Sequence, residues 1–206
     1  MLTAEEVAEV VAAVESRMRP MLAVGAERAQ ARPGSTIPLI EPNPADGALR
    51  AAEAAWGFEA EWSSKLLFNT RIESAVKGSN AWRDAVRGGR CIIPAAAFFE
   101  PHATETVRSA RTGRPAKRAY RFALPSGEPL LFAGVQANGR CSIVTCEPNR
   151  WVSPVHNRMP LILRFEEVTT WLSPDWPALA DRGSIELTVQ PEHPDDPAPT
   201  GQLALF

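Results

Sequence analysis

Short apolar segments, separated by turns rich in proline and glycine, constrain the fold of this chain more than any other feature. None of them approaches the length of a membrane-spanning helix, and bounded short runs of this kind are typical of β-strands. The expected strands are Thr36–Ile40, Leu66–Arg71, Cys91–Pro94, Phe98–Pro101, Ala119–Ala123, Leu130–Val135, Ser142–Thr145, Leu161–Leu163 and Ile185–Val189. Many strands with few helices indicate a single α+β domain, built on a curved, mainly antiparallel sheet or a partial β-barrel with peripheral helices.

Helices are expected at only three places. A capping box and valines at helical spacing predict a helix over residues 4–17. A capping serine precedes a second helix over residues 80–87, and Phe165–Leu172 predicts a third. Leu49–Phe58 is Ala-rich and helix-like, although its last residues, Trp56-Gly57-Phe58, have the character of a strand.

Two connections and the chain end complete the predicted organisation. The segment His102–Lys117 is polar and Arg-rich, which predicts a mobile, solvated loop. A Pro-Ser-Gly turn predicts a hairpin that joins Ala119–Ala123 to Leu130–Val135. We expect one domain over residues 1–190, followed by a Pro-rich, extended tail over residues 191–206 whose apolar end is suited to docking back on the domain.

Composition excludes several classes of protein. The net charge is −2 and the pI about 6.0, so no global basic field favours nucleic acid, although arginines concentrated in the middle third leave room for a local basic groove. Cys91, Cys141 and Cys146 lack metal-binding spacing, which argues against a zinc site or a disulfide framework. With an acidic start and no apolar run of membrane length, we expect a cytoplasmic protein without a membrane partner.

Three strand ends deliver residues that can do chemistry. His156 lies in a loop bracketed by Pro154 and Pro160, between two apolar strands, and a rigidly held imidazole is suited to acid–base work. Asn69 and Arg71 lie two residues apart and so on one face of their strand. Glu100 follows two phenylalanines, whose apolar surroundings could raise its pKa. The alternatives, a surface histidine in an ordinary turn and a solvated glutamate at a strand end, stay open at this level.

Eight ordered motifs resemble the SRAP family, the SOS-response-associated peptidases or abasic-site processing proteins. The motifs are Trp56-Gly57-Phe58, Asn69-Thr70-Arg71-Ile72-Glu73-Ser74, Trp82-Arg83-Asp84-Ala85, Arg90-Cys91-Ile92-Ile93-Pro94-Ala95, Phe98-Phe99-Glu100, Phe132-Ala133-Gly134, Thr145-Cys146-Glu147-Pro148-Asn149 and Pro154-Val155-His156-Asn157-Arg158-Met159-Pro160. The resemblance covers nearly the whole chain, and eight motifs in order are far more specific than any one alone.

The resemblance implies a partner, a reaction and residue roles. Family members bind single-stranded DNA or a strand junction and capture an abasic site. The sugar aldehyde forms a thiazolidine with an N-terminal Cys that self-removal of Met exposes. It implies that a monomer binds abasic single-stranded DNA without metal or cofactor. By motif position, Asn69 orients the sugar or the N-terminus, Glu100 handles protons at the amine, and His156 acts as acid or base on the sugar oxygen. The implied DNA contacts are phosphate binding by Arg71 and Arg158 and base stacking by Trp56 or Phe58.

The start of the chain departs from the family pattern. That pattern begins Met-Cys-Gly-Arg, whereas this chain begins Met1-Leu2-Thr3-Ala4, so the polypeptide as written should not form a thiazolidine. A gene start placed too far downstream is the favoured explanation, and a member that binds abasic DNA without the cross-link is the other. Two further hypotheses remain: a peptidase with Cys146 as nucleophile and His156 as base, and a non-catalytic DNA-binding module.

Overall fold

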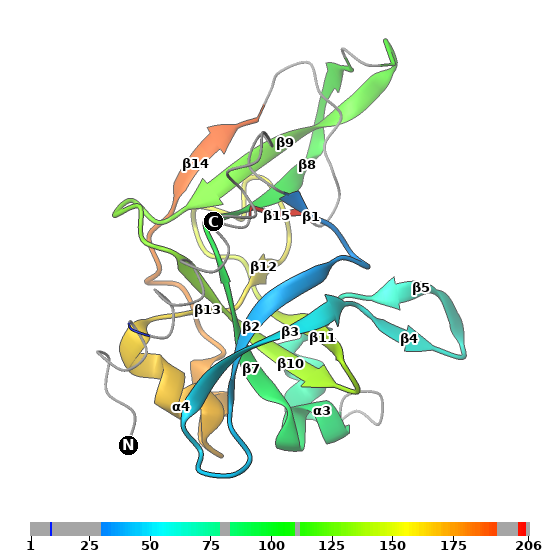
Figure 1. Cartoon of the computed structure of the whole chain (residues 1–206). Coiled ribbons are helices and arrows are strands. Elements are labelled where there is room, and N and C mark those ends of the chain that lie inside the picture. Colours follow the sequence, from blue (N-terminus) through cyan, green and yellow to red (C-terminus); the bar gives the residue numbers. More distant parts are fainter. Residues whose placement is uncertain (1–8, 10–29, 79–82, 110–111, 193–201, 205–206) are drawn as a thin grey trace.

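The computed structural model describes residues 9, 30–78, 83–109, 112–192 and 202–204, which form two curved β-sheets with short helices around them (Figure 1). The larger sheet contains β2 (Thr36–Pro42), β3 (Leu49–Trp56), β6 (Asn69–Arg71), β7 (Arg90–Ala95), β10 (Leu130–Ala137), β11 (Arg140–Cys146), β12 (Met159–Pro160) and β13 (Ile162–Leu163). Its central strands pair in the order β11-β3-β2-β7-β10, and β10 pairs with β11 again, which bends the sheet strongly. Only the pairings of β11 with β3 and β6 are parallel among the described strands, so the expected curved, mainly antiparallel fold is confirmed.

The second sheet rests on the first through aromatic side chains. It contains β1 (Gln30–Ala31), β15 (Gln202–Ala204), β8 (Ala97–Arg108), β9 (Pro115–Ala123) and β14 (Thr188–Pro191) in that order. Phe98 of β8 stacks on Phe122 of β9 at 4.8 Å between ring centroids, and Phe98 also meets Phe132 of β10 edge-on at 6.0 Å. These rings are buried, and their packing joins the two sheets in one core.

Short helices cover the ends of the larger sheet. They are α2 (Ile72–Val76), α3 (Arg83–Gly88), the 3-10 turn η1 (Phe165–Glu167), α4 (Val168–Leu172) and the 3-10 turn η2 (Trp176–Leu179). The helix expected over Phe165–Leu172 is therefore confirmed, and α3 overlaps the second expected helix, over residues 80–87, and ends one residue beyond it. The helix expected over residues 4–17 falls outside the described residues, apart from residue 9. None of the described helices is both long and apolar enough to cross a membrane.

Three local predictions are wrong, each because long-range strand pairing prevails over local sequence. Leu49–Phe58 is not a helix: its Ala-rich residues form β3, which pairs with β2 along its length. Ala119–Ala123 and Leu130–Val135 do not form a hairpin, since β9 pairs with β8 and β14 whereas β10 pairs with β7, β11 and β13. The strand expected over Ile185–Val189 begins only at Thr188.

The Arg-rich segment expected to be a mobile loop is instead an ordered hairpin. Strands β8 and β9 pair from Phe98↔Phe122 to Arg108↔Pro115, with an irregularity between Pro101 and Thr106. The distal part of this hairpin, residues 101–119, is called the arm below. It projects beyond the other strands of the second sheet at the top of Figure 1, and the smaller ribbon of β4 (Phe58–Ala60) and β5 (Ser63–Leu67) projects at the right.

Candidate functional site

Glu100 and His156, which are far apart in the sequence, lie against each other. The distance from Glu100 Oε2 to His156 Nδ1 is 3.6 Å, and the two side chains are 16% and 31% exposed. Glu100 comes from β8, and His156 comes from the loop after β11. The backbone amide of Ala103 donates to the carbonyl of Val155 at 2.9 Å, which fastens β8 to the histidine loop. The structure therefore brings two of the three predicted catalytic residues together.

Burial changes the acid–base character of Glu100. Desolvation raises the pKa of its carboxyl to about 8, because the charged form loses water that the apolar surroundings do not replace. Phe98 and Phe99, which precede it on β8, are both buried. A carboxyl with this pKa is largely protonated at neutral pH and can both donate and accept a proton near that pH.

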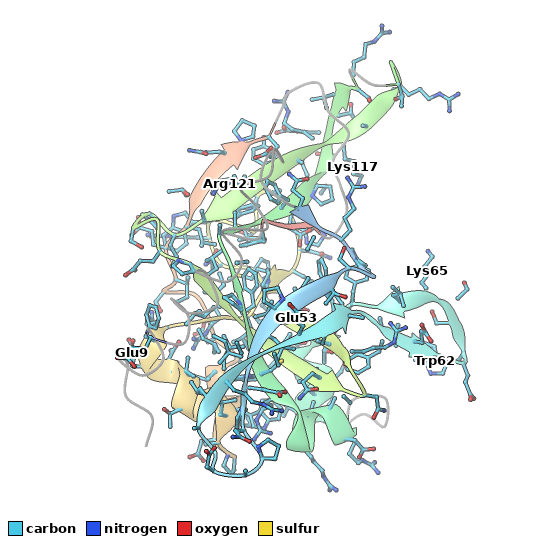
Figure 2. All side chains as sticks on the ribbon, viewed as in Figure 1. Glu9, Glu53, Trp62, Lys65, Lys117 and Arg121 are labelled. Carbon is cyan, nitrogen blue, oxygen red and sulfur yellow. The ribbon has the colours of Figure 1, made fainter. Side chains whose placement is uncertain are left out.

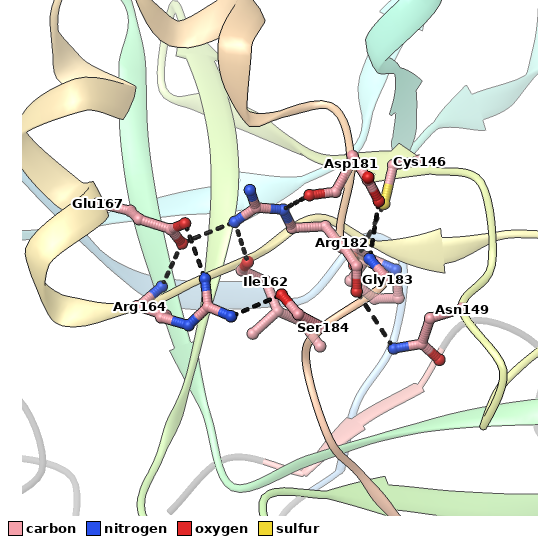
Figure 3. A network of polar contacts seen from close by, with 10 residues as sticks. Cys146, Asn149, Ile162, Arg164, Glu167, Asp181, Arg182, Gly183 and Ser184 are labelled. Carbon is pink, nitrogen blue, oxygen red and sulfur yellow. Dashed lines mark hydrogen bonds and ion pairs between the residues drawn. The ribbon is translucent and has the colours of Figure 1, made fainter.

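The loop that carries His156 is built around one buried amide. Asn149 Oδ1 accepts hydrogen bonds from the backbone amides of Trp151 and Val152, at 3.1 and 3.2 Å. Its Nδ2 donates to the carbonyl of Ile185 at 2.8 Å, and Figure 3 shows the amide beside the segment around Arg182. That segment is fixed in turn by Arg182, whose guanidinium donates to the Glu167 carboxylate at 2.6 Å. Asn149 thus sets the position of a loop that the sequence indicated only through its prolines.

The tautomer of His156 follows from its neighbours. Nδ1 lies 3.0 Å from the carbonyl oxygen of Arg158 and 3.3 Å from the amide nitrogen of the same residue. The shorter contact favours a proton on Nδ1, because only a protonated Nδ1 can donate to a carbonyl. In that tautomer the other ring nitrogen, Nε2, is a proton acceptor.

Arg158 is engaged by carboxylates of its own protein. Its guanidinium donates to both oxygens of Glu73 at 3.0 Å, to Glu147 at 2.9 Å and to the carbonyl of Thr145 at 2.8 Å, and the side chain is 15% exposed. Burial alone would raise the pKa of Glu73, but hydrogen bonds from Arg158 and the backbone, with the charges of Arg158 and Arg71, lower it. These contacts tie α2 and β11 to the histidine loop, so Arg158 positions that loop in this structure, and its expected phosphate contact stays a prediction.

Asn69 and Arg71 lie on β6, next to β11. Asn69 pairs with Ile143 and Arg71 with Thr145, and both side chains are exposed on one face as the two-residue spacing predicted. Thr70, between them, points inward, and its hydroxyl meets that of Ser142 at 2.8 Å. Within the described part of the chain, neither the Asn69 side chain nor the Arg71 guanidinium has a hydrogen bond or ion pair. No contact joins Asn69 to Glu100 or His156 there.

The aromatic residues divide into buried and exposed ones. Trp56 is only 2% exposed, its indole donates to the carbonyl of Phe68 at 2.9 Å, and it therefore has no open face for a base. Phe58 is half-buried at the start of β4. Trp62, at the turn of the β4–β5 ribbon, is 73% exposed and stands clear of the body in Figure 2. Sequence reasoning passed over Trp62, although its acidic and serine neighbours, Glu61 and Ser63, were a usable sign of exposure.

Cys146 does not have the surroundings of a nucleophile. Its thiol is fully buried at the end of β11, its sulfur lies 4.0 Å from the carbonyl of Pro160, and burial raises its pKa to about 12. A catalytic thiol needs a lowered pKa and an adjacent base, whereas His156 Nδ1 faces Arg158 and Glu100. Within the described residues, no group of three or more His, Cys, Asp or Glu side chains could hold a metal ion.

A separate cavity lies beside α2, with Glu73 in its wall. Its volume is about 590 Å³, and its walls include Ile72, Val76, Pro148 and Pro177. Neither Glu100 nor His156 lines it. The cavity is therefore distinct from the acid–base pair, although Glu73, Glu147 and Asn149, which help to hold the histidine loop, line it.

Comparison with known proteins decides the family. The model of the SOS response associated peptidase (SRAP) family matches residues 2–193. The chain belongs to the SRAP family. Its SRAP relatives include the abasic site processing protein YoaM of Bacillus subtilis, which is 29% identical over 61% of this chain and 57% of the relative. Another, YoqW of the same bacterium and of the Bacillus phage SPbeta, is 27% identical over 71% of this chain and 66% of the relative.

Solved structures show the same SRAP-like fold. A phage-related protein from Bordetella bronchiseptica superposes with a TM-score of 0.62 at 22% identity, over 87% of this chain and 90% of that protein. A second protein from the same organism gives a TM-score of 0.63 at 24% identity, over 87% and 95% of the two chains. The chain itself spans 57% to 66% of the length of the two curated relatives.

Proposed function

We propose that this SRAP domain binds abasic sites in single-stranded DNA and, with an N-terminal Cys in place, captures them covalently. The observation that carries the proposal is the Glu100–His156 pair, which places a carboxyl of pKa about 8 within 3.6 Å of an imidazole. The capture of an aldehyde by an amine requires a group that accepts a proton and a group that donates one, and a carboxyl next to an imidazole can supply both. The names of the relatives YoaM and YoqW support the same substrate.

In the proposed reaction each proton has a carrier. The closed abasic sugar opens when its anomeric hydroxyl loses a proton and its ring oxygen gains one, and we assign this transfer to His156. The free amine attacks the aldehyde carbon, water leaves, and an imine forms. Addition of the Cys thiol to the imine carbon, with its proton passing to the nitrogen, closes the thiazolidine. We assign Glu100 to the amine, because it can accept the ammonium proton and then donate to the departing hydroxyl.

Side chains of β6 and of the β4–β5 ribbon are suited to contact the DNA strand. We assign phosphate binding to Arg71, whose guanidinium is exposed on β6. We assign stacking on a neighbouring base to Trp62 or Phe58, and such stacking stabilises binding by roughly 1–3 kcal/mol per base. An abasic site has no base to unstack, so inserting it costs less than flipping a normal nucleotide. We place Asn69, exposed beside Arg71, at the sugar or the N-terminus.

The test compares the chain as written with a version that carries an added Met-Cys-Gly-Arg start. Each protein is mixed with single-stranded DNA containing one abasic site, and adducts are read on a denaturing gel. We expect a heat-stable adduct with the extended chain, at least ten-fold slower formation in its Glu100→Gln and His156→Gln variants, and none with DNA of intact bases. Absence of the adduct from the extended chain would refute covalent capture.

The non-catalytic DNA-binding module is tested with the same proteins. If the chain only binds DNA, Glu100→Ala and His156→Ala should leave binding and its preference for an abasic site unchanged, whereas Arg71→Ala should weaken binding. The proposal predicts the same binding result, so adduct formation by the extended chain is what discriminates: it should be at least ten-fold slower in the Glu100 and His156 variants. Adduct formation that persists in both variants would favour a mechanism without this pair.

A further inference from the structure

We propose that the arm, residues 101–119, binds the phosphate backbone of the DNA strand as that strand leaves the Glu100–His156 site. The inference rests on the proposed function, because that function places a strand at the foot of the arm. It assigns a role to a segment that neither the acid–base pair nor the exposed residues of β6 requires.

The arm concentrates positive charge in a chain that is acidic overall. Residues 101–119 contain five Lys or Arg and one acidic residue, whereas the whole chain has a net charge of −2. The single acidic residue, Glu105, is already engaged by Arg118 at 3.3 Å and by the Tyr120 hydroxyl at 2.8 Å. A local basic surface on a mildly acidic protein is the electrostatic pattern of a nucleic-acid contact.

The remaining described cations of the arm have no carboxylate partner among the described residues. Arg108 and Arg114 are exposed, and neither guanidinium forms an ion pair with a described residue. Lys117 is exposed and donates to the carbonyl of Ala103 at 2.9 Å, its one hydrogen bond within the part of the chain that the structure describes. Arg108 and Lys117 share one face, since their pairing partners are Pro115 and Thr106 in an antiparallel register. Arg158 differs, because its guanidinium donates to the carboxylates of Glu73 and Glu147 within the protein.

The geometry of the arm directs these cations away from the acid–base pair. Glu100 pairs with Tyr120, and Arg108 pairs with Pro115 five residues farther along β9. At about 3.4 Å per residue, roughly 17 Å of β9 separates the Glu100–Tyr120 pair from the Arg108–Pro115 pair. The amide of Ala103 is bonded to the His156 loop, so the foot of the arm is fixed at the site. Figure 2 shows Lys117 on the edge of the arm that faces the β4–β5 ribbon.

The experiment measures how salt weakens binding of single-stranded DNA about 16 nucleotides long. The test variant is Arg108→Gln with Lys117→Gln. The matched control is Arg87→Gln with Lys77→Gln, which removes the same two residue types from exposed positions near α2 and α3. Each phosphate contact contributes about 0.7 to the slope of log affinity against log salt for single strands. We expect the arm variant to flatten the slope by about 1.4 and the control to leave it unchanged.

Two further measurements separate this inference from the proposed function. On an abasic oligonucleotide of about 4 nucleotides, too short to follow the arm, the extended chain should form its adduct at the same rate with and without the arm substitutions. The same salt titration on duplex DNA tests whether the arm binds paired strands. If the arm substitutions flatten the slope of log affinity against log salt on duplex DNA but not on single-stranded DNA, the inference is overturned. An arm variant whose salt dependence on single-stranded DNA equals that of the wild type would also overturn the inference, whether or not the extended chain forms its adduct.

Discussion

Arginine has opposite surroundings in the histidine loop, residues 147–160, and in the arm. Arg158 in the loop is satisfied by Glu73, Glu147 and a backbone carbonyl. Arg108 in the arm is exposed and has no carboxylate partner among the described residues. A charge that is neutralised within the protein stabilises the fold, and its loss leaves a partner unsatisfied. Removing a charge without an internal partner should change the free energy of unfolding little, so such a charge is available to bind another molecule.

The largest effect should come from Arg158→Met. The substitution leaves the Glu73 carboxylate without its bidentate partner, and we expect the free energy of unfolding to fall by about 2–3 kcal/mol in urea titrations. The double variant Arg158→Met with Glu73→Gln is the control, because it also removes the orphaned charge and should regain part of the loss. Strict additivity of the two substitutions would contradict a direct pair.

The same pair sets a pH dependence. Because the pKa of Glu73 is lowered from 4.5 in the folded protein, its contribution is present above pH 4.5 and is lost as the pH falls through the lowered value. The stability difference between the wild type and Arg158→Met should therefore narrow in acid.

Next in size is Asn149→Ala. This amide makes hydrogen bonds from both ends within the loop and to Ile185, so its removal orphans buried backbone groups and should cost about 2 kcal/mol. The control is Asn43→Ala in a surface turn, where Oδ1 accepts only the amide of Ala45, and where we expect less than about 1 kcal/mol. Adduct formation by the extended chain should also slow in the first variant, because the loop positions His156. Equal effects of the two substitutions would refute this role.

Glu100→Gln should have an effect that depends on pH. The folded pKa is about 8 against 4.5 for an unperturbed glutamate, so between these values the folded protein holds a proton that the unfolded chain has lost. Stability of the wild type should therefore decrease as the pH rises through this window and level off above it. Relative to the wild type, the variant should gain about 1–2 kcal/mol at pH 9 and little at pH 5. Glu53→Gln, at an exposed position of β3, is the control, and a matching gain there would contradict the burial argument.

Sequence reasoning reached the fold class from local patterns, and the family resemblance added Asn69, Glu100 and His156, of which the structure brings the last two together. Apolar runs with turn residues at their ends specify strands locally, and the prolines around His156 mark an ordered loop. What it missed depends on pairing between distant residues: β3 is held as a strand by β2, and the arm by the register of β8 with β9. The partners of Arg158 and the burial of Trp56 also arise from tertiary packing, so local patterns could not reveal that one is a positioning residue and the other part of the core.

The smallest effect on stability should come from substitutions in the arm. This result is the strongest test of the difference between the arm and the histidine loop. Arg108→Gln with Lys117→Gln removes two exposed cations without orphaning a carboxylate, so the free energy of unfolding should change by less than about 0.5 kcal/mol. The same variant is expected to flatten the salt dependence of DNA binding. Urea titration and binding measured on one preparation test both statements. A loss of stability comparable to that of Arg158→Met would mean that the arm is held together by its cations, and the contrast between the two regions would no longer hold.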